Sequence, residues 1–438
     1  MRLFVALAVA SLAADASAQM TLADAVDRAL AKSPGVATAD AEWAAARAAD
    51  DESRSARLPG LTLGGSASRY SDPAIATPIH GLTPLNLPVF DRTLLQSGVN
   101  ASYVLFDAGA RSARIIETSG LSSSAQASTE AARQTAAMRA IAAYATVLAR
   151  AAMVDAQDAR LRAFAAELDR VTQFEAVGRA PHVDRLRVEA AAAAAEAERI
   201  SAAAKLDAAE RELARLLDVD TGETRAAKLV PLEDRGDDLP DRAVLEQQAA
   251  NSPLLRQAQL RAVAQSQSIA MASAARWPQV LASANQQSFA TGRSVLEHDW
   301  NAGVQLRFSL FDGGATSARV ARAASAAKAA DEQFQTVRLE NAVALDRAIA
   351  DFQQNRAAVT SLGKAAERFD EVVRIEKLRL DNGAGTQTDY LRAEADLVAA
   401  RSNLAAAKYG LIISRASAAR IAGVLDRDWV AARFGEKR

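Results

Sequence analysis

Two halves of this 438-residue sequence repeat one another, and the duplication constrains the fold more than any other feature. A Ser-Pro pair, a Leu-Phe-Asp motif, a glycine and an Ala-Arg pair recur in the same order. Phe106 and Phe311 are 205 positions apart, and so are Gly178 and Gly383. The chain is therefore expected to form one set of elements twice. We predict repeats at 19–217 and 241–425, a linker at 218–240 and a tail at 426–438.

The repeated Leu-Phe-Asp-x-Gly motif marks a change from strand to helix. The Asp is expected to cap the following helix, and the Gly eases the turn because it tolerates positive φ. The motif comprises Leu105, Phe106, Asp107 and Gly109 in the first half, and Leu310, Phe311, Asp312, Gly313 and Gly314 in the second.

Before each motif, the sequence predicts one helix and two strands. The helices are expected at Leu22–Arg57 and Asp241–Arg276, each ended by a proline that cannot continue the hydrogen-bond ladder. The strands are expected at 61–70, 99–105, 279–289 and 300–310. Residues 300–310 alternate between apolar and polar types, and their length suits a tilted strand that crosses an outer membrane. A soluble hairpin with one wet face would also alternate, so this pattern leaves both possibilities open.

After each motif, helix-forming residues dominate for about 110 positions, from Ala110 to Leu217 and from Ala315 to Leu425. Apolar side chains recur at coiled-coil spacing, and the many alanines allow close helix packing. Each region is broken once, at Val177–Pro181 and Asp381–Thr386, which predicts two antiparallel helical hairpins. A helix from Phe106 to Gly178 would be about 105 Å long. Such a length is expected of a structure that spans the periplasm.

The N-terminus reads as an export signal at residues 1–18. A charged Arg2, a short apolar run and Ala16-Ser17-Ala18 match a secretory signal peptide and its cleavage site. No uninterrupted run of 18 apolar residues follows, so no membrane-spanning helix is expected. A membrane location would then require a β-barrel. Four strands are too few to close a barrel, since the smallest has eight. Several chains would share one, as a dimer or a trimer.

Composition argues against other classes of protein. The chain has no cysteine, its three histidines are far apart, and no metal or other cofactor is expected. The 52 basic and 53 acidic residues are balanced, so nucleic acid is not an expected partner. An enzyme remains a third class, although the sequence shows no nucleophile–base or metal-binding set.

The duplicated motifs, the two breaks in the helical regions and the signal peptide together resemble the TolC family of outer-membrane efflux proteins. The resemblance covers about Thr21 to Leu425. It implies a mainly α fold: a homotrimer with a shared twelve-stranded barrel in outer-membrane lipid and long coiled-coil helices that form a periplasmic tunnel. It further implies an exit duct that docks with a periplasmic adaptor protein and an inner-membrane pump or exporter, and that performs no chemistry. A periplasmic adaptor with long coiled-coil hairpins is the alternative.

The resemblance also assigns two functional places. The hairpin tips would contact the adaptor; their residues are Gly178, Arg179, Ala180 and Pro181, and Gly383, Ala384, Gly385 and Thr386. The periplasmic aperture would be lined by Asp389 and Arg392, with Asp184 and Arg187 at the same spacing in the first half. Read from the residues alone, the tip glycines could simply end helices, and the Asp/Arg pairs could be exposed ion pairs of little weight.

Overall fold

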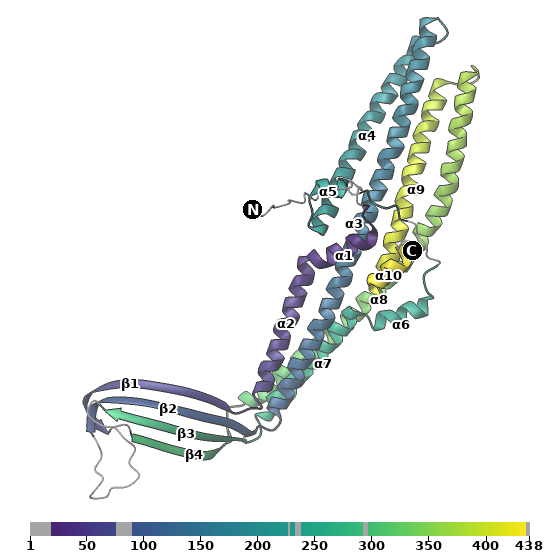
Figure 1. Cartoon of the computed structure of the whole chain (residues 1–438). Coiled ribbons are helices and arrows are strands. Elements are labelled where there is room, and N and C mark those ends of the chain that lie inside the picture. The colour runs from purple at the N-terminus through teal and green to yellow at the C-terminus, as the bar shows by residue number, and fades with distance from the viewer. Residues whose placement is uncertain (1–18, 76–89, 227, 233–237, 292–296, 435–438) are drawn as a thin grey trace, which may run out of the picture. The chain divides into compact units, whose positions relative to one another are not determined.

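A computed structural model describes residues 19–75, 90–226, 228–232, 238–291 and 297–434 of the chain (Figure 1). The signal peptide expected at 1–18 lies outside these residues. Contacts between residues divide the chain into two compact units, which we describe separately. One unit holds the strands and the adjoining helix segments (40–128 and 256–337), and the other holds the rest of the helices.

The strand unit contains one antiparallel sheet in the order β1-β2-β3-β4. Its strands are β1 (Gly60–Ile75), β2 (Phe90–Phe106), β3 (Gln279–Thr291) and β4 (Glu297–Arg307). All four expected strands are present, and the first two are longer than the alternation indicated. β4 ends at Arg307, three residues earlier than expected. Gln279 pairs with Arg307, and the preceding Pro278 has no N–H with which to extend the ladder.

The expected helices at 22–57 and 241–276 are each two helices, which corrects the prediction. They are α1 (Leu22–Lys32) and α2 (Pro34–Ser55), and α6 (Arg242–Ala250) and α7 (Pro253–Ala274). The break comes at the Ser-Pro pair in both halves, because proline disfavours the helical conformation in the residue before it. Ser33 accordingly has extended backbone angles (φ −65°, ψ 117°).

Both long helical hairpins are present, as predicted from the sequence. They consist of α3 (Ala110–Ala176) with α4 (His182–Leu217), and α8 (Ala315–Asp381) with α9 (Gln387–Ile421) (Figure 1). With 67 residues each, α3 and α8 are about 100 Å long. By length and composition alone, one window of α3 is apolar enough to cross a membrane, and a third of that window is buried inside the protein.

Asp107 and Asp312 cap the long helices, as expected, but each lies two residues before the N-cap position, which Gly109 and Gly314 occupy. The Asp107 carboxylate accepts a hydrogen bond from the Arg111 amide (3.0 Å), and the Asp312 carboxylate accepts one from the Thr316 amide (2.7 Å). The intervening turn requires positive φ, which Gly109 adopts at +86° and Gly314 at +87°. The motif therefore turns the chain and satisfies the first free helix amides.

The main apolar core of the helical unit surrounds Tyr144, which is fully buried. The Tyr144 hydroxyl lies 2.7 Å from the carbonyl oxygen of Met20 and 2.9 Å from that of Val230. Met20 also forms a parallel bridge with Leu229. The short helices α5 (Thr221–Ala226) and α10 (Arg427–Phe434) follow the first hairpin and the second. Tyr144 thus holds the start of the chain and the linker on one helix.

We expect Gly423→Ala to destabilise the helical unit by about 2 kcal/mol or more. Gly423 has φ +78°, and an added Cβ would lie 2.8 Å from Ser252 Cα and 2.9 Å from Pro253 Cδ. Thermal unfolding followed by circular dichroism measures the effect. Gly363→Ala is the matched control, because Gly363 lies within α8 with open space around it and alanine should there stabilise slightly. Equal melting temperatures for the two variants would contradict this expectation.

Candidate functional sites at the hairpin tips and on the sheet

The two hairpin tips have the same turn geometry. Gly178 and Gly383 both adopt φ +71°, a conformation that favours glycine. In each turn the next amide bonds back five residues: Arg179 N–H to Phe174 O (2.7 Å), and Ala384 N–H to Arg379 O (2.8 Å). These are Schellman-type helix ends. The tip glycines therefore end their helices, and their contact with an adaptor stays a prediction.

An ionic cluster closes the first tip. The Glu175 carboxylate lies 2.7 Å from His182 Nδ1 and 2.7 Å from Arg185 Nε. These two hydrogen bonds lower the pKa of Glu175 below its usual range. The His182 side chain is mostly exposed but is also bonded to Glu175. The cluster joins the end of α3 to the start of α4.

The four predicted aperture residues lie on the first two turns of α4 and α9. Arg187 Nη1 is 3.1 Å from Asp184 Oδ1, so this pair forms on an exposed helix face. In the second hairpin, the Asp389 amide and carboxylate both bond the Thr386 hydroxyl, which caps α9. Arg392 is exposed one turn later. Their role at an aperture remains a prediction.

A buried charge network near these turns was missed by the sequence analysis. The Glu167 side chain is fully buried and lies 2.6 Å from Arg170 Nη2 on the same helix. It also contacts the ammonium group of Lys377 on α8, so it joins one hairpin to the other. Asp381 lies 3.5 Å from Lys377 and 3.7 Å from Arg170. Burial alone would raise the pKa of Glu167, but the hydrogen bonds from Arg170 and Lys377 outweigh it and hold this pKa below its usual range.

Two further buried polar groups lie on α9. The Tyr390 hydroxyl donates to Glu394 Oε1 at 3.0 Å, and Lys377 Nζ is 5.2 Å from the centre of the Tyr390 ring. Burial raises the pKa of Glu394, an effect only partly offset by this hydrogen bond. A buried Glu at the 167 position carried no sequence signal, because its partner Lys377 is 210 residues away.

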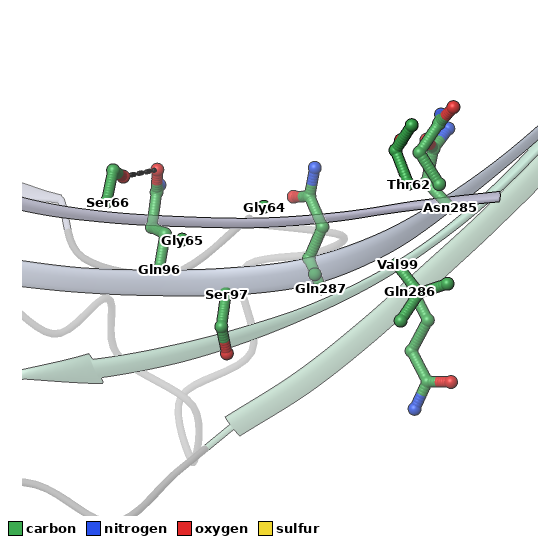
Figure 2. A pocket seen from close by; sticks show the side chains of 12 residues that line it. Thr62, Gly64, Gly65, Ser66, Gln96, Ser97, Val99, Asn285, Gln286 and Gln287 are labelled. Atoms are coloured by element: carbon green, nitrogen blue, oxygen red, sulfur yellow. Dashed lines mark hydrogen bonds between the residues drawn. The ribbon is translucent and has the colours of Figure 1, made fainter.

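The sheet has one apolar and one polar face. Figure 2 shows Thr62, Gln96 and Gln287 on one side, with Ser97 and Gln286 on the other. At one level of the polar face, Thr62, Asn100, Asn285 and Asn301 are direct cross-strand neighbours. Asn100 Nδ2 donates to Asn285, and Asn285 Nδ2 donates to Asn301 Oδ1 at 2.9 Å. We call this set the asparagine row.

The opposite face presents large apolar side chains to its surroundings. They are highly exposed in the single chain, at 66–81% of their full area: Leu61, Leu63, Trp300, Val304 and Leu306. Water-soluble monomers rarely expose a continuous apolar face of this kind. Polar side chains such as Ser97 and Gln286 also lie on this face, but the large apolar side chains gather on it and the asparagine row lies on the other. Such a division of side chains suits the wall of a membrane barrel.

Among the described residues, no group of His, Asp and Glu side chains could hold a metal ion.

The profile of the family described as "Outer membrane efflux protein" matches residues 25–218 and 244–424. The chain belongs to this family. Membership places this efflux protein in the outer membrane and favours a channel over the periplasmic adaptor that the sequence had left as an alternative. The relatives are channels rather than enzymes.

Individual relatives agree with this family. The efflux protein is 30% identical over 161 residues to the outer membrane efflux protein BepC of Brucella suis biovar 1 (strain 1330); the match spans 37% of this chain and 35% of BepC. Its fold is similar to that of the outer membrane protein VceC from Vibrio cholerae (TM-score 0.76, 20% identity, 92% of this chain and 96% of VceC). It is also similar to the Campylobacter jejuni CmeC outer membrane channel (TM-score 0.80, 16% identity, 95% and 87%).

Proposed function

We propose that this efflux protein is the exit duct of a tripartite efflux or type I secretion system. Three copies share one twelve-stranded barrel, and their hairpins form a periplasmic tunnel. A periplasmic adaptor and an inner-membrane pump or exporter deliver the cargo and supply the energy, and the duct itself performs no chemistry. Residues 1–18 are removed on export, and the repeats at 19–217 and 241–425 are joined through the 218–240 linker.

The exposed apolar face of the sheet carries this proposal. Four strands with one polar face can enclose a water-filled lumen only when other copies complete the barrel, because an open edge in lipid leaves backbone groups unpaired. Three copies supply twelve strands and two supply eight; the family resemblance supports the proposal of three. Extraction separates a barrel from an adaptor, since a barrel needs detergent for release while an unanchored adaptor is released by salt.

The hairpin tips are the proposed adaptor contacts. The two turns have one geometry and present exposed residues, which suits a partner that binds both. We expect Gly178→Trp or Gly383→Trp to reduce export at least tenfold in a cell-based efflux assay. Trimers should still form, because no atom lies within 4 Å of an added Cβ at either glycine, although positive φ adds about 1 kcal/mol of strain.

Gly314→Trp is the matched control, since Gly314 also has positive φ and open space around an added Cβ but lies just before α8, far from the tips in sequence. Export at the wild-type level by both tip variants would contradict docking at the tips.

The aperture is proposed to lie at the first turns of α4 and α9, with Asp389, Arg392, Asp184 and Arg187 as its charged residues. Asp389, Arg392 and Arg187 are exposed and Asp184 is half-buried, so the three exposed residues are able to meet other copies around a threefold axis. The buried link from Glu167 to Lys377 supports this placement, because it joins the two hairpins of one chain close to the same turns.

A further inference from the structure

The two edge strands of the sheet differ in total length, but their regular parts are of similar length and could pair between neighbouring copies. In the described part of the sheet, β1 and β4 are the edges. β4 has 11 residues, and β1 has 16 with a register irregularity between Arg69 and Ala74. The regular part of β1 therefore starts at Gly60 and ends about ten residues later. It matches β4 in length.

From these edges we infer the register between copies: β4 of one chain pairs antiparallel with β1 of the next, with Asn301 opposite Ser66. This inference rests on the proposed shared barrel and names the contact that would close it. All of β4, from Glu297 to Arg307, then lies opposite Tyr70 to Gly60. Residues His298 to Arg307 of β4 then gain partners from the regular part of β1, and Glu297 lies opposite Tyr70, one residue beyond it.

Barrel geometry limits the choice of register. An offset between copies must be even, because an odd offset would place polar side chains on the apolar face. Within one chain, Asn301 is level with Thr62 through the asparagine row. Pairing with Ser66 displaces this level by four residues per copy, and in twelve strands this gives a tilt of about 35°. No offset gives no tilt, and six residues give about 47°, whereas barrel strands tilt by about 35–45°.

Side chains on both faces agree with this register. On the apolar face it places Leu306 opposite Leu61 and Val304 opposite Leu63, which pairs exposed apolar residues with each other. With Thr62 opposite Asn301 instead, Leu306 would face Arg57 and Val304 would face Pro59, both before β1 begins. Pairing with Ser66 covers more apolar area.

The hydrogen bonds of the polar face also continue across this junction. Donation runs from Asn100 to Asn285 and from Asn285 to Asn301. Asn301 Oδ1 is an acceptor in this chain of bonds, and its amide hydrogens can donate onward. Ser66 Oγ donates to Gln96 Oε1 at 3.3 Å and keeps its lone pairs for an incoming donor. Asn301 of one copy would therefore donate to Ser66 of the next.

The absence of cysteine from the sequence allows a direct test. We expect the double variant Asn301→Cys with Ser66→Cys to form covalent trimers on a non-reducing gel. Directly opposite residues have Cα atoms about 4.5–5.5 Å apart, which suits a disulfide. Asn301→Cys combined with Thr62→Cys or Ser68→Cys should cross-link at least tenfold less, because diagonal and more distant positions exceed about 7 Å.

The outcomes separate this inference from the proposed function. Stronger cross-linking through Ser68 or Thr62 would overturn the register and leave the shared barrel standing. If light scattering in detergent shows trimers but none of the cysteine pairs cross-links, the register is also overturned and the shared barrel stands. A monomer in detergent that does not cross-link would overturn the shared barrel, and the register with it. Each single-cysteine variant serves as the control for assembly.

Discussion

Glu167→Ala is expected to lower the stability of the helical unit by about 3 kcal/mol per chain. The substitution leaves Arg170 and Lys377 without the buried carboxylate that both contact. In the described part of the chain, Asp381 is the carboxylate that stays within 4 Å of each. Because Lys377 is on the other hairpin, the loss also releases α8 from α3. If the aperture lies at these turns, single-channel conductance in planar bilayers should rise several-fold. Circular dichroism melts measure the stability term.

The direction of the pKa shift predicts how the stabilisation by Glu167 changes with pH. The pKa of Glu167 is lowered in the folded protein, so its stabilisation is present above the unfolded pKa of about 4.3 and is lost as pH falls through the folded pKa. The difference between wild type and Glu167→Ala should therefore shrink below about pH 4. Glu371→Gln is the matched control, since Glu371 forms an exposed pair with Arg374 and its loss should change stability by less than about 1 kcal/mol.

Two results would count against this account. An unchanged melting temperature for Glu167→Ala would mean that the link carries no stability, and an unchanged conductance would separate it from the aperture. Asp389→Ala, recorded in the same bilayers, tests the predicted aperture residue directly: a conductance equal to that of the wild type would remove it from the gate.

Val304→Arg is expected to abolish assembly in the outer membrane. Val304 lies on the apolar face and is 68% exposed in the single chain, so an arginine there would face lipid. Arginine near the middle of a bilayer costs about 2–4 kcal/mol, and a trimer would incur this cost three times. The measurement is the amount of heat-resistant trimer in detergent-extracted outer membranes.

Gln305→Arg is the neighbouring control on the polar face, where water should solvate the charge. It should assemble to the wild-type level. Normal assembly of Val304→Arg, or equal loss in both variants, would show that the apolar face does not meet lipid.

Local patterns predicted most of the fold because the deciding signals are close in sequence. The strand alternation and the tip glycines each depend on neighbours within a few residues. The asparagine row does not, because it joins Asn100 to Asn285, 185 positions away. The Ser-Pro breaks could have been read as helix ends by the same rule that was applied to Pro59 and Pro278. Glu167 is different: a charged residue at a coiled-coil position reads as solvent-exposed, and only the long-range contact with Lys377 makes its burial tolerable. Whether the charged turns form an aperture depends on other copies of the chain, which one sequence does not contain.

The tether at Tyr144 makes the order of synthesis matter for folding. Met20 emerges early, but the strand partner that it needs, Leu229, emerges more than two hundred residues later. Until then, the hydroxyl of Tyr144 can reach the Met20 carbonyl but not the Val230 carbonyl. The first repeat expressed without the linker would therefore lack the Val230 carbonyl, which is one of the two acceptors close to this hydroxyl.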